Sequence, residues 1–200
     1  MTDLFEPKQD NQIQNGVFKT QINGMFYIER PYHKDQRGFF SEVVKVPNIE
    51  SYTGSPFQIK QINHARSEKN VIRGIHAEGW NKFVFIVSGV GFAAIVDVRP
   101  ESSTFGNKEF FKLGLAEDAL SGCLFLPSGI GNSICVLDGP LDYIYVVDKL
   151  YEDRDTSGDL AISVFDPDLQ IPWPIKREDM IISERDINSI TLREKHPEKF

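Results

Sequence analysis

The sequence predicts an all-β protein of the jelly-roll type, with only short helices at its periphery. Three observations indicate this fold class. Apolar runs rich in β-branched and aromatic residues recur at short intervals, Gly, Pro or Asp interrupts almost every run, and helical periodicity is weak throughout. Many short strands at regular spacing with little helix are typical of a β-sandwich or β-barrel.

The strand-forming runs follow one another in order along the chain. Residues 57–65 ("FQIKQINHA") alternate polar and apolar positions, as a half-buried strand does. The stretch 83–100 ("FVFIVSGVGFAAIVDVRP") indicates two buried strands joined by a tight turn at 88–91, where glycines permit the backbone angles of a turn. Further strands are expected over 110–117, 122–129, 132–139 and 141–151, and short helices only near 48–52 and in the last twenty residues.

The chain is long enough for one domain with a sizeable core. It has 200 residues, of which 40% are hydrophobic, and it has no internal repeat and no linker rich in Gly, Ser or Pro. We therefore expect a single domain over 1–200. Within it, residues 1–30 form an N-terminal segment and residues 175–200 a C-terminal tail with short helices.

Charge and cysteine content exclude several classes of protein. The net charge of −7 argues against binding to nucleic acid or to an anionic membrane surface, although a local basic pocket could still hold a small anion. No apolar stretch reaches the ~18 residues of a membrane span, and the polar start "MTDLFEPKQDNQ" is unlike a signal peptide. Cys123 and Cys135 lie in apolar runs, which favours reduced, buried thiols. We expect a cytoplasmic protein without nucleic-acid or membrane partners.

A few polar residues within the strand-like runs are candidates for chemistry. His76 follows "IRG", and Lys82 directly precedes a run of buried-type residues, where a lysine either extends its charge outward or meets a partner inside. Tyr143 and Tyr145 share one face of a strand. Each also has an ordinary interpretation: a structural histidine, an outward-pointing lysine, packing tyrosines. Residue types alone leave both open.

A metal site is not indicated by the sequence. The four histidines are His33, His64, His76 and His196, and no two of them form the His-x-His pair that metal-binding β-barrels of this type use. In the segment "PSGIGNSI", Asn132 stands where a further ligand could have been. We predict no metal and no other cofactor.

Taken together, several ordered blocks resemble the dTDP-4-dehydrorhamnose 3,5-epimerase family, the nucleotide-sugar epimerases of the cupin class. The similarity covers about 35–190. "DQRGFFSEV" resembles D-x-R-G-x-F-x-E, "QINHARSEKNVIRGIHAE" resembles Q-x-N-x-S-x-S…V-x-R-G-L-H, and "VDVRPESSTFG" resembles D-x-R-x-x-S-x-T-F-G. "LPSGIGNSICVL" resembles P-x-G-x-x-H-G-F, and "DPDLQIPWP…IISERD" resembles D-P-x-x-x-I-x-W-P…L-S-x-x-D. Each block alone is a weak signal, whereas the ordered set is specific.

The resemblance implies a set of catalytic residues at matching positions. His76 matches the catalytic histidine, Asp186 the aspartate that orients it, Lys82 the lysine and Tyr145 the catalytic tyrosine. Arg73 matches the arginine that contacts the nucleotide diphosphate. Other positions match the segment that helps to hold the nucleotide, or surround the pocket: Arg37, Phe40, Glu42, Gln61, Asn63 and Asn132.

The chain departs from the family pattern around the expected sugar pocket. Ala77 and Glu78 stand in place of the usual aromatic residue and Gln, Asn132 replaces a histidine, and Ala93 stands where an aspartate is common. The segment between His76 and Lys82 is also short. The resemblance implies epimerisation in deoxysugar or polysaccharide biosynthesis, whereas the departures leave the nucleotide base, the sugar and the inverted carbons open.

The implied chemistry needs these residue types. The carbonyl of a 4-keto-6-deoxy sugar acidifies the protons on C3 and C5, and a histidine ordinarily titrates near neutral pH, where a positioned base works best. An aspartate on the other ring nitrogen fixes the tautomer, a lysine stabilises the enolate, and a tyrosine returns a proton from the opposite face. Such a reaction requires neither a metal nor a redox cofactor.

Three other functions remain open at this point. A single-carbon epimerase and a 3,4-ketoisomerase could use the same scaffold, although ketoisomerases rely on a histidine pair that this sequence lacks. A non-catalytic sugar-binding cupin is the alternative from another class, but it would not need an acid and a base. The resemblance further implies a nucleotide-diphosphate 4-keto-6-deoxy sugar as ligand and a homodimer in which N-terminal strands of 1–30 are exchanged.

Overall fold

The computed structural model describes residues 3–153 and 159–200. The strands are β1 (Gln12–Gln14), β2 (Val17–Lys19), β3 (Phe26–Ile28), β4 (His33–Asp35), β5 (Gly38–Phe40), β6 (Gln61–Ser67), β7 (Val71–Ala77), β8 (Lys82–Asp97), β9 (Lys108–Gly114), β10 (Cys123–Leu126), β11 (Ile130–Val147), β12 (Leu160–Ile162) and β13 (Ile181–Ile182). The helices are α1 (Val46–Thr53), α2 (Glu184–Ile187) and α3 (Leu192–Lys195), with 3₁₀ turns η1 (Gln9–Asn11), η2 (Tyr151–Asp153), η3 (Arg177–Asp179) and η4 (Pro197–Lys199).

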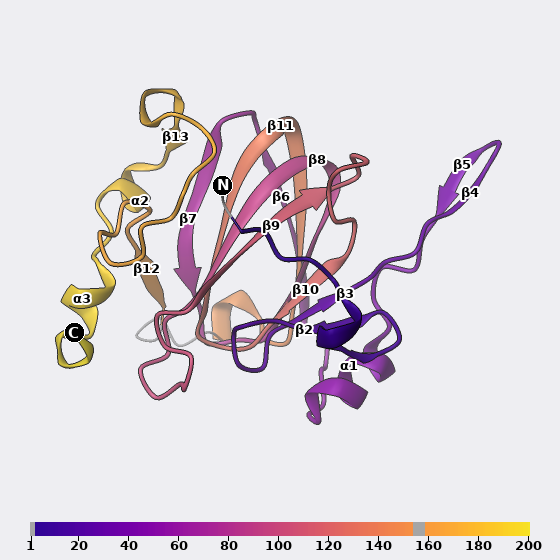
Figure 1. Ribbon diagram of the computed structural model, residues 1–200, viewed down its shortest axis with the longest axis horizontal. Coiled ribbons are helices and arrows are strands. Elements are labelled where there is room, and N and C mark those ends of the chain that lie inside the picture. The colour runs from indigo at the N-terminus through magenta and orange to yellow at the C-terminus, as the bar shows by residue number, and fades with distance from the viewer. Residues whose placement is uncertain (1–2, 154–158) are drawn as a thin grey trace.

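The strands form a double-layered β-sandwich, which confirms the predicted jelly-roll class (Figure 1). In one layer, the first half of β8 pairs with β10 and with the second half of β11, which also pairs with β6. In the other layer, the second half of β8 pairs with β9 and with the first half of β11, which also pairs with β7. Strands β8 and β11 therefore run through both layers.

The tight turn predicted at 88–91 is wrong, because β8 continues through these residues as one strand. Gly89 has a φ of +83°, and a Cβ on it would lie 2.7 Å from the main-chain oxygen of Asp138 on β11. Glycine permits this close approach where β8 bends from one layer into the other. The strands predicted at 132–139 and 141–151 are likewise joined in one long strand, β11, which ends at Val147.

The main core lies between the two layers and is lined by side chains from both. Phe111 of β9, Ile95 of β8 and Tyr143 of β11 are almost completely buried there. Ile144 and Val146 lie on the opposite face of β11, in a second cluster beneath α1. Alternation along β11 thus places Tyr143 and Tyr145 on one face, as the sequence predicted.

Strand β6 alternates as predicted, but its polar side chains face inward. Asn63 and Ala65 line a cavity, whereas Ile62 on the other face is 62% exposed. The short helices also lie where they were expected, at 46–53 and near the C-terminus. The C-terminal segment with β13 and α2 packs beside β7 (Figure 1).

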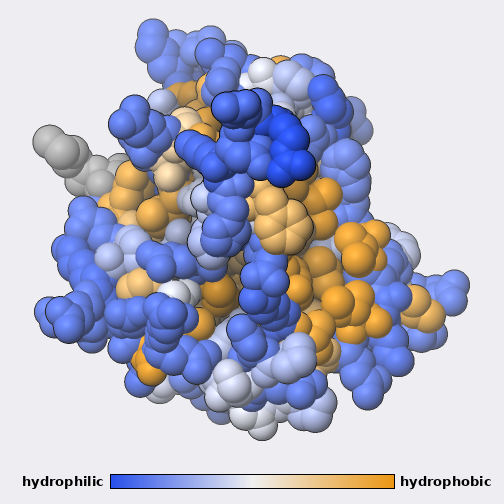
Figure 2. Space-filling model, turned by 90° about the vertical axis from the view of Figure 1, so that its right-hand side faces the viewer, coloured by the Kyte–Doolittle hydropathy of each residue, from blue (hydrophilic) through white to orange (hydrophobic). Residues whose placement is uncertain are grey.

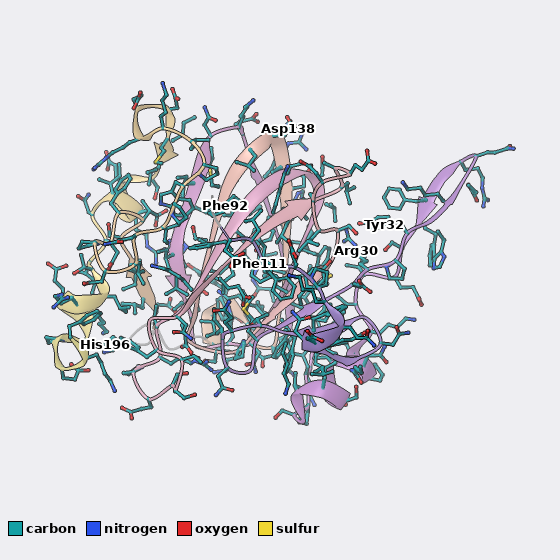
Figure 3. All side chains as sticks on the ribbon, viewed as in Figure 1. Arg30, Tyr32, Phe92, Phe111, Asp138 and His196 are labelled. Atoms are coloured by element: carbon teal, nitrogen blue, oxygen red, sulfur yellow. The ribbon has the colours of Figure 1, made fainter. Side chains whose placement is uncertain are left out.

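The β4–β5 hairpin extends away from the sandwich (Figure 1). Within the described residues its strands pair only with each other, and Phe39 and Phe40 are more than half exposed. Arg30 and Tyr32 lie at its base (Figure 3). There the buried guanidinium of Arg30 donates to the Tyr32 hydroxyl and, over 3.0 Å, to the main-chain oxygen of Ile86. These bonds attach the base of the hairpin to β8.

Candidate active site

One cavity brings together residues from both layers and from the C-terminal segment. Its volume is about 700 Å³. The residues that line it and that the sequence singled out come from four strands and from α2: Asn63, Arg73, His76, Lys82, Asn132, Tyr145 and Asp186. The structure therefore gathers all four predicted catalytic residues at one place.

His76 and Asp186 form a hydrogen-bonded pair in this cavity. His76 lies on β7, and its Nε2 is 2.6 Å from Oδ1 of Asp186. The other carboxylate oxygen of Asp186 accepts the main-chain N–H of Gly74 at 3.1 Å. Ser183, the N-cap of α2, accepts the main-chain N–H of Asp186 through its hydroxyl at 3.2 Å. The carboxylate is thus held by β7 on one side and by its own helix on the other.

Asp186 is held in its ionised form. Burial alone would raise the pKa of Asp186, but the hydrogen bond and the charge of His76, with the bonds from Gly74 and Ser183, lower it to about 2. An ionised carboxylate only accepts hydrogen bonds, so Nε2 of His76 carries the shared proton. Nδ1 of a neutral His76 is then the nitrogen with a free lone pair.

Lys82 is the most deeply buried cation of the cavity, with 2% of its side chain exposed. Its ammonium donates to a carboxylate oxygen of Glu78 and, over 3.3 Å, to the main-chain oxygen of His76. A buried ammonium needs such partners, since removing one member of a buried ion pair costs about 3–5 kcal/mol. The sequence left open whether the Lys82 charge extends outward or meets a partner inside. The structure shows that it points inward and pairs with Glu78.

Tyr145 lies on β11, next to Tyr143, with ring centroids 4.7 Å apart. Burial raises the pKa of Tyr145 well above its usual value; the positive charge of Arg73 opposes this and the negative charge of Glu78 adds to it. The phenol is therefore protonated at neutral pH and can donate a proton. Asn132 is buried on the same strand and accepts the Tyr143 hydroxyl at 3.1 Å, which makes it a support for Tyr143.

Arg73 presents a cation at the side of the cavity. Its Nε donates to the Ser67 hydroxyl at 2.9 Å, and its Nη2 to the main-chain oxygen of Arg66 at 3.2 Å. Among the described residues, no carboxylate lies within ion-pair distance of it. A guanidinium has five N–H donors, so several remain for an anionic ligand.

Four of the predicted ligand-binding residues lie outside this cavity in the single chain. Gln61 lies at its edge, where its amide donates to Asn63 at 2.6 Å. Arg37 and Phe40 belong to the hairpin: Arg37 pairs with Asp35 at 2.6 Å, and Phe40 is 65% exposed. Glu42 follows the hairpin and pairs with Lys45 at 2.5 Å.

A larger cavity, of about 1000 Å³, lies between the base of the hairpin and α1. Arg30, Tyr32, Glu42 and Tyr52 contribute to its walls. Figure 2 looks onto this side of the molecule and shows apolar groups between hydrophilic ones. None of the predicted catalytic residues lines this larger cavity.

Sequence reasoning missed other residues of the candidate active-site cavity. Glu78 was noted only as a departure from the family pattern, and its contact with Lys82 was not foreseen. Trp80 and Tyr151 also line the cavity, with ring centroids 6.4 Å apart, as does Arg185. Of these residues, only Glu78 could have been recognised from the sequence. A carboxylate four residues before an isolated lysine in an apolar run is a candidate ion-pair partner for that lysine.

Cys123 and Cys135 are free and buried, as predicted, and burial raises the pKa of each thiol to about 12. In the described part of the chain, no cluster of three or more His, Cys, Asp or Glu could hold a metal ion. No helix among the described residues is long and apolar enough to span a membrane.

Comparison with known proteins agrees with this geometry. The family model for dTDP-4-dehydrorhamnose 3,5-epimerase matches residues 19–194. A dTDP-4-dehydrorhamnose 3,5-epimerase of Shigella flexneri is 31% identical over 176 residues, which are 86% of this chain and 93% of that protein. A dTDP-4-dehydro-6-deoxyglucose 3-epimerase of a Streptomyces species is 31% identical over 176 residues, 86% of each chain.

A solved structure shows the same fold. It is that of a dTDP-6-deoxy-D-glucose-3,5-epimerase from Legionella pneumophila in complex with dTDP-4-keto-L-rhamnose. That chain is 28% identical, with a TM-score of 0.78 over 88% of this chain and 92% of its own. Fold, cavity and relatives together define the protein as an isomerase built on a cupin-like β-sandwich. It belongs to the dTDP-4-dehydrorhamnose 3,5-epimerase family.

Proposed function

We propose that this protein is a cytoplasmic, cofactor-independent epimerase that inverts C3, C5 or both in a nucleotide-diphosphate 4-keto-6-deoxy sugar, as a step of deoxysugar biosynthesis. The observation that carries the proposal is the union of the His76–Asp186 pair with Lys82 and Tyr145 in one cavity. The two buried, reduced cysteines fit a reducing compartment.

His76 acts as the base. Its Nδ1 takes a proton from the carbon next to the C4 carbonyl, and the electrons of the broken C–H bond move into the carbonyl to form an enolate. The imidazole becomes an imidazolium, which the ionised carboxylate of Asp186 stabilises at 2.6 Å. A base positioned in this way contributes about 10²–10⁴ in rate.

Lys82 stabilises the negative charge that develops on O4. Its ammonium is buried and hydrogen-bonded, so it is already oriented before the charge appears. A preorganised donor in a site with little water is worth more than the same donor in bulk solvent. Removing one comparable donor typically costs about 10²–10³ in kcat.

Tyr145 completes the inversion. Its protonated phenol delivers a proton to the same carbon from the opposite face, the carbonyl is restored, and solvent then returns a proton to the phenolate and takes one from His76. Carbon configuration changes without net oxidation or reduction. The phenol of Tyr145 is protonated at neutral pH, so it holds the proton that this step transfers.

Arg73 holds the diphosphate of the nucleotide. Its free N–H donors can bind phosphate oxygens in a bidentate way, which explains how an acidic protein captures an anionic ligand. The names of the relatives given above refer to dTDP-linked sugars, so we propose thymine as the base of the nucleotide.

We further propose a homodimer in which the β4–β5 hairpin reaches the second copy. Residues 12–28 pair within their own chain, through β3 and β10, so the hairpin over 33–40 is the part of the N-terminal region that leaves the body. Strand β6 offers an unpaired edge beside the cavity in the described chain. A hairpin from the second copy at that edge would bring its Arg37, Phe40 and Glu42 towards the nucleotide.

Inversion of C3 alone is the second candidate, because the Streptomyces relative, which is also 31% identical over 176 residues, is named as a 3-epimerase. Proton NMR in D₂O with dTDP- and GDP-4-keto-6-deoxyglucose distinguishes the candidates. Exchange at C3 and C5 with inverted product supports a 3,5-epimerase, and exchange at C3 alone supports a 3-epimerase. A shifted carbonyl indicates a ketoisomerase. Binding without exchange would refute catalysis in favour of a sugar-binding protein.

A further inference from the structure

Glu78 is a carboxylate inside the cavity, at a position where the family pattern usually has Gln. It belongs to the short loop 78–81 between β7 and β8, and this loop is held in place by neighbouring segments. The main-chain oxygen of Glu78 accepts the N–H of Gly129 at 3.0 Å. The side chain of Asn81 donates to Asp148 at 2.7 Å. Glu78 therefore projects from an anchored backbone.

The contacts of Lys82 show what Glu78 does in this position. An ammonium has three N–H donors. One donates to Glu78 and a second to the main-chain oxygen of His76. Among the described residues no further acceptor is bonded to the Lys82 ammonium, so one N–H remains for a group in the cavity.

The two acceptors restrict how the ammonium can turn. A lysine side chain has four flexible carbon–carbon links, so its charge has no fixed direction of its own. In this site the stem is buried, and the acceptors belong to the end of β7 and to the anchored loop after it. When the ammonium makes both of these hydrogen bonds, the direction of its third N–H is fixed.

We propose that Glu78 is a positioning residue for Lys82. Its carboxylate and the main-chain oxygen of His76 hold the ammonium so that the remaining N–H donates to O4 of the substrate as negative charge develops there. This inference rests on the enolate role proposed for Lys82. Orientation matters because a misplacement of about 1 Å in a catalytic group can cost ~10² in rate.

The first test removes the side chain of Glu78. Glu78→Ala should lower kcat by about 10- to 100-fold and leave KM little changed, because the affected donor contact strengthens only in the transition state. Glu78→Gln keeps an oxygen acceptor at the same distance from the backbone and should recover most of this loss. If both variants fold and both keep the wild-type kcat, or if the Gln variant is as slow as the Ala variant, the proposal is wrong.

The second test asks whether Glu78 acts through Lys82. Glu78→Ala is combined with Lys82→Met, and the double variant is compared with Lys82→Met alone by deuterium exchange into the substrate. A residue that only positions Lys82 has nothing left to position, so we expect equal rates. A further loss of 10-fold or more in the double variant would show that Glu78 has a different role.

Failure of the proposed function would look different. Wild-type protein that exchanges no substrate proton, or Lys82→Met protein at full rate, would contradict the proposed reaction or the role of Lys82 before Glu78 is considered. Thermal unfolding of each variant verifies folding. If Glu78→Ala does not fold because the buried ammonium lacks its partner, the double variant carries no such charge and still gives the comparison.

A matched control is available on the surface. Asp118 pairs with Lys112, neither residue lines the cavity, and Asp118 is mostly exposed. Asp118→Ala also removes a carboxylate from a lysine ion pair, and it should leave kcat unchanged. This control distinguishes a specific effect of Glu78 on Lys82 from a general effect of removing one negative charge from the protein.

Discussion

Nε2 of His76 lies 2.6 Å from Oδ1 of Asp186, although 110 positions separate the two residues in the chain. The contact joins β7 to the first turn of α2, so the C-terminal segment completes a pair whose other member belongs to the central sandwich. Because the ionised carboxylate accepts the proton of Nε2, the ring can turn Nδ1 to the substrate as the base.

His76→Asn tests the base. Asparagine is smaller and can keep a hydrogen bond to Asp186, so the fold should be retained. Hydrogen exchange at C3 and C5 should fall by about 10²–10⁴, the usual contribution of a general base. The measurement is proton NMR of substrate in D₂O. Exchange near the wild-type rate would mean that another group takes the proton.

Tyr145→Phe separates proton removal from inversion. The ring still packs beside Tyr143, and neither the base nor Lys82 needs the phenol, so the enolate should still form. His76 can then return a deuteron to the face from which it removed the proton. Recovered substrate should contain deuterium by mass spectrometry, while inverted product falls ~10²-fold or more. Inversion at full speed would identify Tyr145 as a packing residue only.

Asp186 should make stability depend on pH in the acid range. Its pKa is about 2 in the folded protein, against about 3.9 in an unfolded chain. A lowered pKa contributes stability that is complete above the unfolded value and is lost as the pH falls towards the folded value. The free energy of unfolding of the wild type should therefore approach that of Asp186→Asn between about pH 4 and pH 2. Urea denaturation measures both, and parallel curves would contradict the assignment.

Gly74→Ala tests the space that the pair requires. A Cβ on Gly74 would lie 2.6 Å from the carboxylate carbon of Asp186. The Asp186 side chain is too short to relieve this clash by bending away. The variant should displace Asp186 from His76, lower kcat by ~10² or more and lower the melting temperature. Gly79→Ala adds the same methyl group where nothing lies within 4 Å, and it should behave as the wild type.

The fold class was predictable because alternation and turn residues are local signals. Gly89 shows their limit. A glycine within a strand-like run permits either a reversal or a bend, and the choice depends on β11, which approaches within 2.7 Å of the missing Cβ. No residue near Gly89 in the sequence carries that information.

The site was predictable only through resemblance. Nothing in the local pattern around Asp186 connects it with His76, because the contact depends on how β13 and α2 pack on β7. Ile62 and Asn63 illustrate a second difficulty: the apolar residue faces out and the polar one faces in, since the inward face of β6 borders a polar cavity. In the sequence, Glu78 is only a departure from the family pattern. In the structure, its carboxylate is the hydrogen-bond partner of the Lys82 ammonium.

The burial of both cysteines has a practical consequence for studying the hairpin. Thiol reagents attack thiolates, and the thiols of Cys123 and Cys135 are both inaccessible and, with a pKa of about 12, almost never ionised at neutral pH. A single new cysteine at the exposed tip of the hairpin would therefore take a spin label or fluorophore selectively, without first replacing the native cysteines. Distances between two such labels in solution would then report directly how far the two hairpins of an assembly lie from each other.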